Sequence, residues 1–198
     1  MYTFMKPVFM FDVYKTLVDC PGWETYLAQT PALKQLEQDW LRDRAQYQEA
    51  YMRAFDVAVE QGKCNVYAYE EVRLVLGHFY NRGAIGVYSS GSKKCIFQML
   101  ESAGIKDLFS NTELILSLDD LRVGAKDTPE AFQTLHRYLA AHSFEMKSYV
   151  DDSEKIVKAV VRSGAAIERV YQVNRSHVGT GLQKEGYSVI SSLDQMRR

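Results

Sequence analysis

The feature that most constrains this chain is an apolar run near its start that ends abruptly in a carboxylate. Residues 7–11 read Pro-Val-Phe-Met-Phe, and Asp12 follows directly. Because no polar residue interrupts the run, it is typical of a strand that is buried on both faces, as in a parallel sheet. Ligands of such sheets bind in the crevice beyond the carboxyl ends of the strands. At that position Asp12 can serve as a nucleophile, a metal ligand or a base, or it can simply begin a turn.

The composition is that of one folded domain with room for a small insertion. The chain has 198 residues, of which 46% are hydrophobic and 25% are charged, which excludes a disordered chain. A formal net charge of -1 gives no reason to expect a nucleic-acid or membrane partner. The apolar start is too short to span a membrane. The chain has three cysteines, which are Cys20, Cys64 and Cys95. They lack the spacing of a metal site, so we expect free thiols and a cytoplasmic protein.

The segment after the first strand is helical in pattern. A Thr-Pro pair at 30–31 is typical of a helix start, and Gly62 is typical of a helix end. Between them apolar residues recur at steps of three to four, which predicts amphipathic helices. We therefore expect a small helical cap inserted into a core domain, with the cap at 18–66 and the core at 1–17 and 67–198.

From residue 67 onward, segments typical of helices and strands alternate along the chain. The first of them is a helix expected over 67–81. Such alternation predicts an α/β fold with a Rossmann-like parallel sheet and helices on both of its faces. The strands expected after the first one cover 84–88, 114–116, 146–150 and 170–173, and a short edge strand covers 187–190.

Hydroxyl groups and a glycine follow the strand expected over 84–88. The residues are Ser89, Ser90, Gly91 and Ser92, and a helix pattern begins after them. Backbone N–H groups at a helix start, beside a serine hydroxyl, form a natural site for an anion. The plainer interpretation is that Ser92 caps the helix, and the two interpretations are compatible.

Two further sites carry charge just ahead of an expected helix. Lys126 precedes a Thr-Pro helix start, and taken out of context such a lysine is ordinary solvated surface. Asp151 and Asp152 end another expected strand. Beside Asp12 they would build the carboxylate-rich site that Mg2+ prefers, whereas alone they would only cap the next helix.

Taken together, these positions resemble the four motifs of the haloacid dehalogenase (HAD) superfamily. The string from Phe11 to Leu17 is similar to the first motif, in which the first Asp attacks phosphorus or carbon. The string from Tyr88 to Ser92 is similar to the enolase-phosphatase branch. The resemblance implies a HAD-like core with a small cap directly after the first motif. The second, third and fourth motifs fall on Ser89, Lys126 and Asp151-Asp152.

Three positions depart from the superfamily pattern. Most of its phosphatases carry a second Asp, which protonates the leaving group, where this chain has Tyr14. They carry Gly where this chain has Lys15, and a later Asp of the fourth motif is Ile156 here. The proton for the leaving group must then come from Tyr14, from water or from the substrate.

The resemblance implies a Mg2+-dependent hydrolase of a small-molecule phosphomonoester. Asp12 would attack phosphorus, and the metal would screen the phosphoryl charge. The residues implied are Asp12, Tyr14, Ser89 and Lys126 for catalysis, Thr16, Ser90 and Gly91 for substrate binding, and Asp12, the Tyr14 carbonyl, Asp151 and Asp152 for Mg2+.

Two other functions stay open on the sequence. Asp-x-Tyr-x-Thr is the first-motif variant seen in L-2-haloacid dehalogenases, in which the same Asp attacks carbon and no metal is needed. The replacements at Tyr14, Lys15 and Ile156 also fit a catalytically degenerate protein with a binding or regulatory role. Aromatic residues amount to 12%, many of them in the insertion, which leaves room for a homodimer surface.

Overall fold

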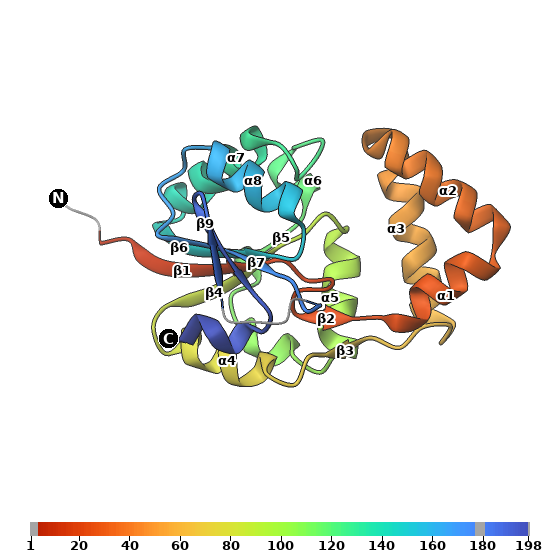
Figure 1. Cartoon of the computed structure of the whole chain (residues 1–198), viewed down its shortest axis with the longest axis horizontal. Helices are drawn as coiled ribbons and strands as arrows, with labels where there is room; N and C mark the ends of the chain where they lie inside the picture. Colours follow the sequence, from red (N-terminus) through yellow and green to blue (C-terminus); the bar gives the residue numbers. More distant parts are fainter. Residues whose placement is uncertain (1–3, 177–180, 198) are drawn as a thin grey trace.

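A seven-stranded sheet forms the centre of the molecule, in the order β5-β4-β1-β6-β7-β9-β8 (Figure 1). The computed structural model describes residues 4–176 and 181–197. Each neighbouring pair runs parallel except β8 and β9, which are antiparallel. The strands are β1 Lys6–Phe11, β4 Ala84–Tyr88, β5 Ile115–Leu116, β6 Phe144–Asp151, β7 Arg169–Val173, β8 Leu182–Lys184 and β9 Tyr187–Ile190.

Helices cover both faces of the sheet, as predicted. Alternate side chains of β1 feed the two layers, because Phe9 and Phe11 pack in one apolar cluster while Val8 and Met10 pack in the other. In Figure 1 one layer lies above the sheet and the other below it. Within the described residues, none of the helices could cross a membrane. The first layer contains α4 Val72–Tyr80 and α5 Lys93–Ser102, and the second contains α6 Leu118–Leu121, α7 Pro129–Ala141 and α8 Glu154–Arg162.

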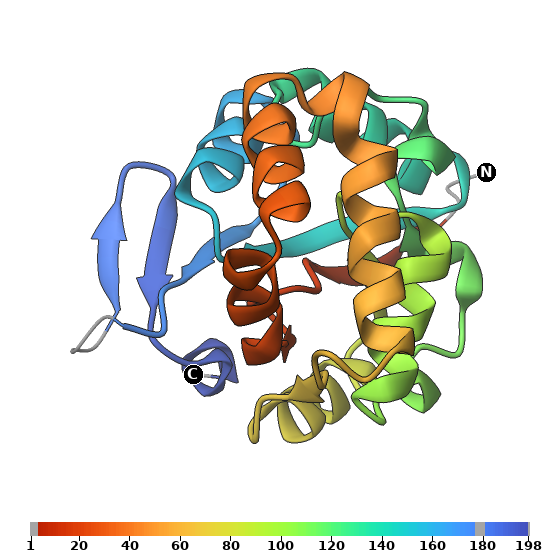
Figure 2. The same ribbon diagram turned by 90° about the vertical axis from the view of Figure 1, so that its right-hand side faces the viewer.

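Three helices follow β1 and stand in front of the strand ends when viewed from that side (Figure 2). They occupy the segment for which the sequence predicts helices, whereas the division of the chain into a core and a cap stays our prediction. Their inner face is aromatic: the indole N–H of Trp23 donates to the Tyr51 hydroxyl at 3.2 Å, and the Trp40 and Tyr51 rings stack at 4.4 Å. The helices are α1 Pro21–Gln29, α2 Pro31–Arg42 and α3 Arg44–Glu60.

A two-stranded ribbon, absent from the sequence prediction, joins these helices to the rest of the chain. It pairs β2 Val18–Asp19 with β3 Tyr67–Ala68 in antiparallel fashion. The prediction of a helix from residue 67 was therefore wrong over its first residues, since α4 begins at Val72. The pairing partners are far apart in sequence and each strand has two residues, so no local pattern announces them.

The end of the chain also differs from its prediction. The strand over 187–190 was expected at the sheet edge, but β9 lies inside the sheet between β7 and β8. The true edge strand, β8, exposes all three of its residues. A strand with no buried side leaves no alternation of apolar and polar residues, which is why the sequence did not indicate it.

Arg175 fastens the segment after β7 to the start of the chain. Its guanidinium donates to Glu71 Oε1 at 2.7 Å and to the Thr16 carbonyl at 2.8 Å, and it lies 3.3 Å from the centre of the Tyr69 ring. These contacts give Arg175 a structural role.

Replacing Glu71 with Gln is expected to destabilise the protein near neutral pH and to matter less in acid. Burial opposes the charge of Glu71, but the hydrogen bond and charge of Arg175, together with backbone hydrogen bonds to the carboxylate, outweigh burial and lower the pKa of Glu71 below 4.5. A carboxylate with a depressed pKa contributes stability above its unfolded pKa and loses it as the pH falls through its folded pKa. Urea unfolding of both proteins from about pH 6 down to about pH 3 measures this. A difference between them that stays constant over that range would contradict the assignment.

Candidate active site

The sheet register brings three polar residues level at the carboxyl ends of adjacent strands. Asp12 lies one residue beyond the last paired position of β1, level with Tyr88 on β4 and Asp151 on β6. The Asp12 N–H donates to the Val150 carbonyl at 2.8 Å, which continues the ladder of backbone hydrogen bonds. The sheet itself therefore fixes where the Asp12 carboxylate lies.

Lys126 enters this edge from the loop before α7 and is only 1% exposed. Its ammonium donates to Asp12 Oδ1 and, at 2.8 Å, to Asp151 Oδ2. The rings of Tyr88 and Tyr149 each lie 5.6 Å from Nζ. Although burial would lower the pKa of Lys126, the charges of Asp12 and Asp151 outweigh it and hold that pKa above its ordinary value. The structure therefore contains a buried ammonium ion between two carboxylates.

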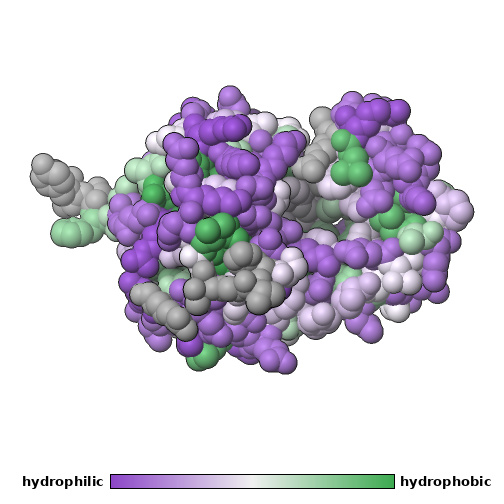
Figure 3. All heavy atoms as spheres, in the orientation of Figure 1, coloured by the Kyte–Doolittle hydropathy of each residue, from purple (hydrophilic) through white to green (hydrophobic). Residues whose placement is uncertain are grey.

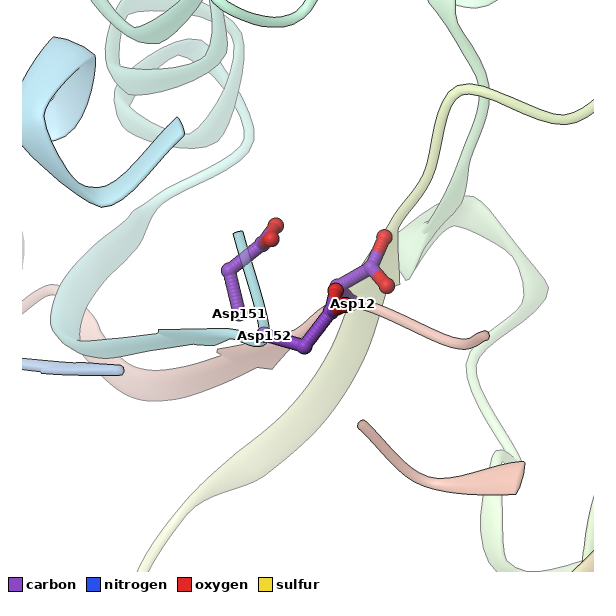
Figure 4. Close-up of side chains that lie close together, drawn as sticks. All are labelled: Asp12, Asp151 and Asp152. Atoms are coloured by element: carbon purple, nitrogen blue, oxygen red, sulfur yellow. The ribbon is translucent and has the colours of Figure 1, made fainter. Parts of the chain in front are cut away.

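The two acids at the end of β6 have different surroundings. Asp151 Oδ2 accepts from Lys126 and, at 2.9 Å, from the Tyr149 hydroxyl, while Oδ1 accepts from the Ser153 N–H at 2.9 Å. Asp152 is less buried, and its side chain extends toward Asp12 (Figure 4). Asp151 thus has both oxygens engaged by the protein, so Asp152 is the better placed of the two to bind a ligand directly.

The three carboxylates form one cluster whose charge exceeds that of the lysine. One oxygen each from Asp12, Asp151 and Asp152 lies within 4.8 Å of the others. Burial raises the pKa of Asp12 to about 6, and burial together with the charges of Asp12 and Asp151 raises the pKa of Asp152 to about 8. An added cation would relieve this repulsion. The all-oxygen donor set fits Mg2+, which binds carboxylate oxygens in preference to sulfur or nitrogen.

The Tyr14 side chain is packed against the helices and is poorly suited to act as a general acid. Its ring meets the Phe55 ring of α3 edge-on at 6.0 Å, and its buried hydroxyl has no hydrogen-bond partner among the residues that the structure describes. Burial raises the pKa of Tyr14 above its usual range, so the phenol stays protonated and is a weak proton donor. The role of its backbone carbonyl as a metal ligand stays a prediction.

Lys15 shows why a glycine is usual at its position. The backbone φ of Lys15 is 63°, in the left-handed region that glycine adopts readily and that is strained for other residues. The ammonium of Lys15 pairs with Asp19 at 2.9 Å and with Glu24 at 3.2 Å. These ion pairs bind the first motif to the following ribbon and to α1, and they offset part of the backbone strain.

The remaining predicted residues lie around the same edge of the sheet. Ser89 is buried directly after β4, where its N–H donates to the Leu116 carbonyl at 3.1 Å. Thr16 is fully buried, and within residues 4–176 and 181–197 its hydroxyl has no hydrogen-bond partner. Ser90 and Gly91 line a cavity of about 680 Å³ between α3 and the strand ends. Ser92 does cap α5, because its hydroxyl accepts from the Cys95 N–H at 3.2 Å.

Sequence reasoning missed the two tyrosines that enclose Lys126. Both are fully buried, and both rings contact Phe132, at 5.8 Å for Tyr88 and 5.0 Å for Tyr149. They differ at the hydroxyl: that of Tyr149 donates to Asp151, whereas that of Tyr88 has no hydrogen-bond partner in the described part of the chain. Tyr149 precedes Asp151 by two residues, so strand alternation puts both on one face, and this signal could have identified it.

Replacing Tyr149 with Phe is expected to reduce the free energy of unfolding by about 1.5–3 kcal/mol, because a buried hydrogen bond to a carboxylate is lost. Tyr88→Phe is the matched control. It removes an equally buried hydroxyl near the same lysine but breaks no hydrogen bond, so we expect it to be neutral or slightly stabilising. Urea unfolding measures both variants. Equal destabilisation by the two would show that the hydroxyl contact to Asp151 contributes nothing.

Comparisons with known proteins place this fold. No protein-family model and no curated protein matches the sequence significantly. A HAD phosphatase from Thermococcus onnurineus superimposes with a TM-score of 0.68 at 19% identity, covering 96% of each chain. An L-2-haloacid dehalogenase from Xanthobacter autotrophicus gives 0.63 at 17% identity over 96% of each chain. Another L-2-haloacid dehalogenase gives 0.66 at 16% identity over 96% of each chain.

These structures show the fold that the sequence motifs implied. The chain has the HAD-like α/β architecture over nearly its whole length. Because phosphatases and dehalogenases both occur among the similar structures, the fold by itself does not choose between chemistry at phosphorus and chemistry at carbon. That choice depends on the residues at the strand ends.

Proposed function

We propose that the protein is a Mg2+-dependent phosphomonoester hydrolase with Asp12 as its nucleophile. The observation that carries this proposal is the acid pair at the end of β6, whose oxygens lie within 4.8 Å of those of Asp12. Such a donor set suits a hard divalent cation. Displacement of a halide needs no metal in the dehalogenases that the first motif resembles, and extra carboxylates there would only repel a carboxylate substrate.

Each residue of the site has a separate role in the proposed reaction. Asp12 attacks phosphorus and forms an acyl phosphate as the bond from phosphorus to the leaving oxygen breaks; water then cleaves the acyl phosphate, releasing phosphate and restoring the carboxylate. The Lys126 ammonium, which already contacts Asp12, would hold a phosphoryl oxygen. Ser89 would donate to a second oxygen. Mg2+ bound by Asp12, Asp152 and Asp151 would supply charge neutralisation at the phosphoryl group.

Proton delivery sets a limit on the substrates. The first motif has Tyr14 in place of the usual acid, and burial raises the pKa of this phenol above its usual range. Protonation of a poor leaving group is therefore slow unless the substrate or a water molecule supplies the proton. We expect turnover to favour phosphoesters whose leaving group either needs little protonation or carries its own proton donor near the leaving oxygen.

A second candidate function is halide displacement. The Asp-x-Tyr arrangement at Asp12 and Tyr14 favours this function. One of the similar structures, at 16% identity, is an L-2-haloacid dehalogenase from Xanthobacter autotrophicus with chloropropionic acid covalently bound. In this reaction Asp12 would displace chloride from carbon, and the resulting ester would be hydrolysed by water. A regulatory protein without turnover is the third possibility.

Metal removal separates these functions. With p-nitrophenyl phosphate, whose leaving group barely needs protonation, we expect phosphate release in Mg2+ and a loss of about 10²-fold or more in EDTA. Chloride release from L-2-chloropropionate, followed in EDTA, is expected to be absent. Chloride release without metal and no phosphate release with metal would overturn the proposal in favour of dehalogenation. No release of either ion by the folded protein would favour a role without catalysis.

A further inference from the structure

A cavity of about 680 Å³ opens between α3, the segment that follows β4 and the segment that leads to Lys126. Ser90 and Gly91 line it from the second motif, and Gly124 lines it two residues before Lys126. Figure 3 shows the surface hollowed between the helical part and the rest of the molecule. A phosphoester whose phosphoryl group lies at Asp12 would therefore place its leaving group in this cavity. Its volume suits a small organic group.

The charged side chains that line the cavity carry an excess of acid. Among the described residues that line it, six are charged, four negative and two positive. Glu60 and Lys94 pair with each other at 3.4 Å, which cancels one charge of each sign. The acids that remain outnumber the bases by three to one. The lining side chains with charge are Glu49, Asp56, Glu60, Asp119, Arg53 and Lys94.

Asp56 is the least satisfied of these groups. Its Oδ1 is buried and has no hydrogen-bond partner among the described residues, and other atoms of Asp56 line the cavity. Burial raises the pKa of Asp56, and the Cys95 thiol, a weak donor, and the Lys94 ammonium only partly oppose this rise. A buried carboxylate oxygen without a donor is costly, and a ligand that supplies an N–H or O–H would relieve that cost.

The helix that carries Asp56 is anchored to both catalytic motifs. Phe55 contacts Tyr14 of the first motif, and a side-chain carbon added at Gly91 of the second motif would lie 3.7 Å from the Met52 sulfur. Met52 and Asp56 are one helical turn apart and therefore share a face of α3. Asp56 thus faces the same edge of the sheet as the phosphoryl site.

We propose that Asp56 selects the leaving group, and that this cavity admits neutral or cationic leaving groups bearing hydrogen-bond donors, such as amino alcohols and polyols. Anionic leaving groups are rejected, because they would face Asp56, Glu49 and Asp119. This inference rests on the proposed phosphatase function and adds the class of substrate to it.

Three small phosphoesters of similar size test this inference: phosphoethanolamine, glycerol phosphate and phosphoglycolate, with cationic, neutral and anionic leaving groups. We expect kcat/KM for phosphoethanolamine to exceed that for phosphoglycolate by about tenfold or more, with glycerol phosphate between them. Asp56→Asn is expected to reduce that ratio by about tenfold. Glu101→Gln, which removes one negative charge from the exposed side of α5 outside the cavity, is expected to leave the ratio unchanged.

p-Nitrophenyl phosphate, measured in the same buffer with Mg2+, reports on the phosphatase chemistry independently of leaving-group charge. A wild-type enzyme that hydrolyses it but prefers phosphoglycolate, or shows equal kcat/KM for the three esters, would overturn the inference while leaving the proposed function intact. A ratio that Asp56→Asn does not alter would exclude Asp56 as the selecting residue.

Discussion

Replacing Asp12 with Asn is expected to reduce phosphate release by about 10⁴-fold or more, because an amide cannot form the acyl phosphate. The fold should survive. Asn retains an acceptor oxygen for Lys126, and the change removes one of three carboxylates that repel each other within 4.8 Å. We therefore expect the melting temperature of the metal-free variant to equal or exceed that of the wild type. Phosphate release and thermal unfolding, measured on the same sample, check both parts.

Two outcomes would count against this assignment. Turnover within tenfold of the wild type would mean that another group attacks phosphorus. Loss of turnover together with a much lower melting temperature would mean that Asp12 supports the fold more than the chemistry. The Glu101→Gln variant, changed by one charge far from the cluster, controls for handling and purity.

Replacing Lys126 with Met is expected to remove turnover and to cost about 3–5 kcal/mol of unfolding free energy, because two buried carboxylates lose their ammonium partner. Lys126 is 1% exposed and bonds Asp12 and Asp151, which are themselves buried. Urea unfolding at neutral pH measures the loss. A destabilisation below about 1 kcal/mol would show that the carboxylates do not depend on this lysine.

The pH dependence of that variant gives a second test. The pKa of Asp12 is already raised to about 6 with the lysine in place, and without it burial would raise that pKa further. A carboxyl group whose folded pKa exceeds its unfolded pKa makes the protein less stable as the pH rises between the two values. Lys126→Met should therefore be least destabilised in mild acid. Lys126→Arg, which keeps the charge, should show a weaker pH dependence.

Asp12 and Ser89 were predictable because each follows a short apolar run. Asp151 ends a strand that is polar in its middle, and its acid pair just ahead of a helix pattern was the signal. A parallel sheet brings such strand ends to one edge. Lys126 differs, since a lysine in a loop is usually solvated, and only its place in the motif order indicated burial. The Thr-Pro helix start at 128 was also predicted, and the Thr128 hydroxyl accepts from the Ala131 N–H at 3.3 Å.

The features that the sequence did not reveal depend on contacts between distant residues. Arg175 and Glu71 are 104 positions apart, and neither lies in a pattern that marks it as a partner of the other. The pairing of β2 with β3 likewise joins positions that are far apart in the sequence. The strand β8 was missed for another reason: its residues are all exposed, so it has no periodic apolar face. Asp56 belongs to a helix whose amphipathic pattern predicts packing, and only the folded chain shows that its carboxylate lines a cavity.

The two departures at the first motif have separate physical consequences. Lys15 adopts a left-handed backbone conformation that glycine accommodates without strain, so this departure concerns stability and the hold on α1. Tyr14 replaces a carboxylic acid by a buried phenol, so that departure concerns the proton that the leaving group needs. Neither change disturbs the contact between Asp12 and Lys126.

The central claim is that Asp12 becomes phosphorylated, and trapping that intermediate tests it most directly. The enzyme would be mixed with p-nitrophenyl phosphate and Mg2+, quenched in acid within a single turnover, reduced with borohydride and digested for peptide sequencing by mass spectrometry. We predict that homoserine, the reduction product of an aspartyl phosphate, replaces Asp12 in the peptide from the first strand. An unmodified Asp12 together with a reduced residue elsewhere in the chain would contradict the claim. Hydrolysis of the substrate without any reduced residue would also contradict it.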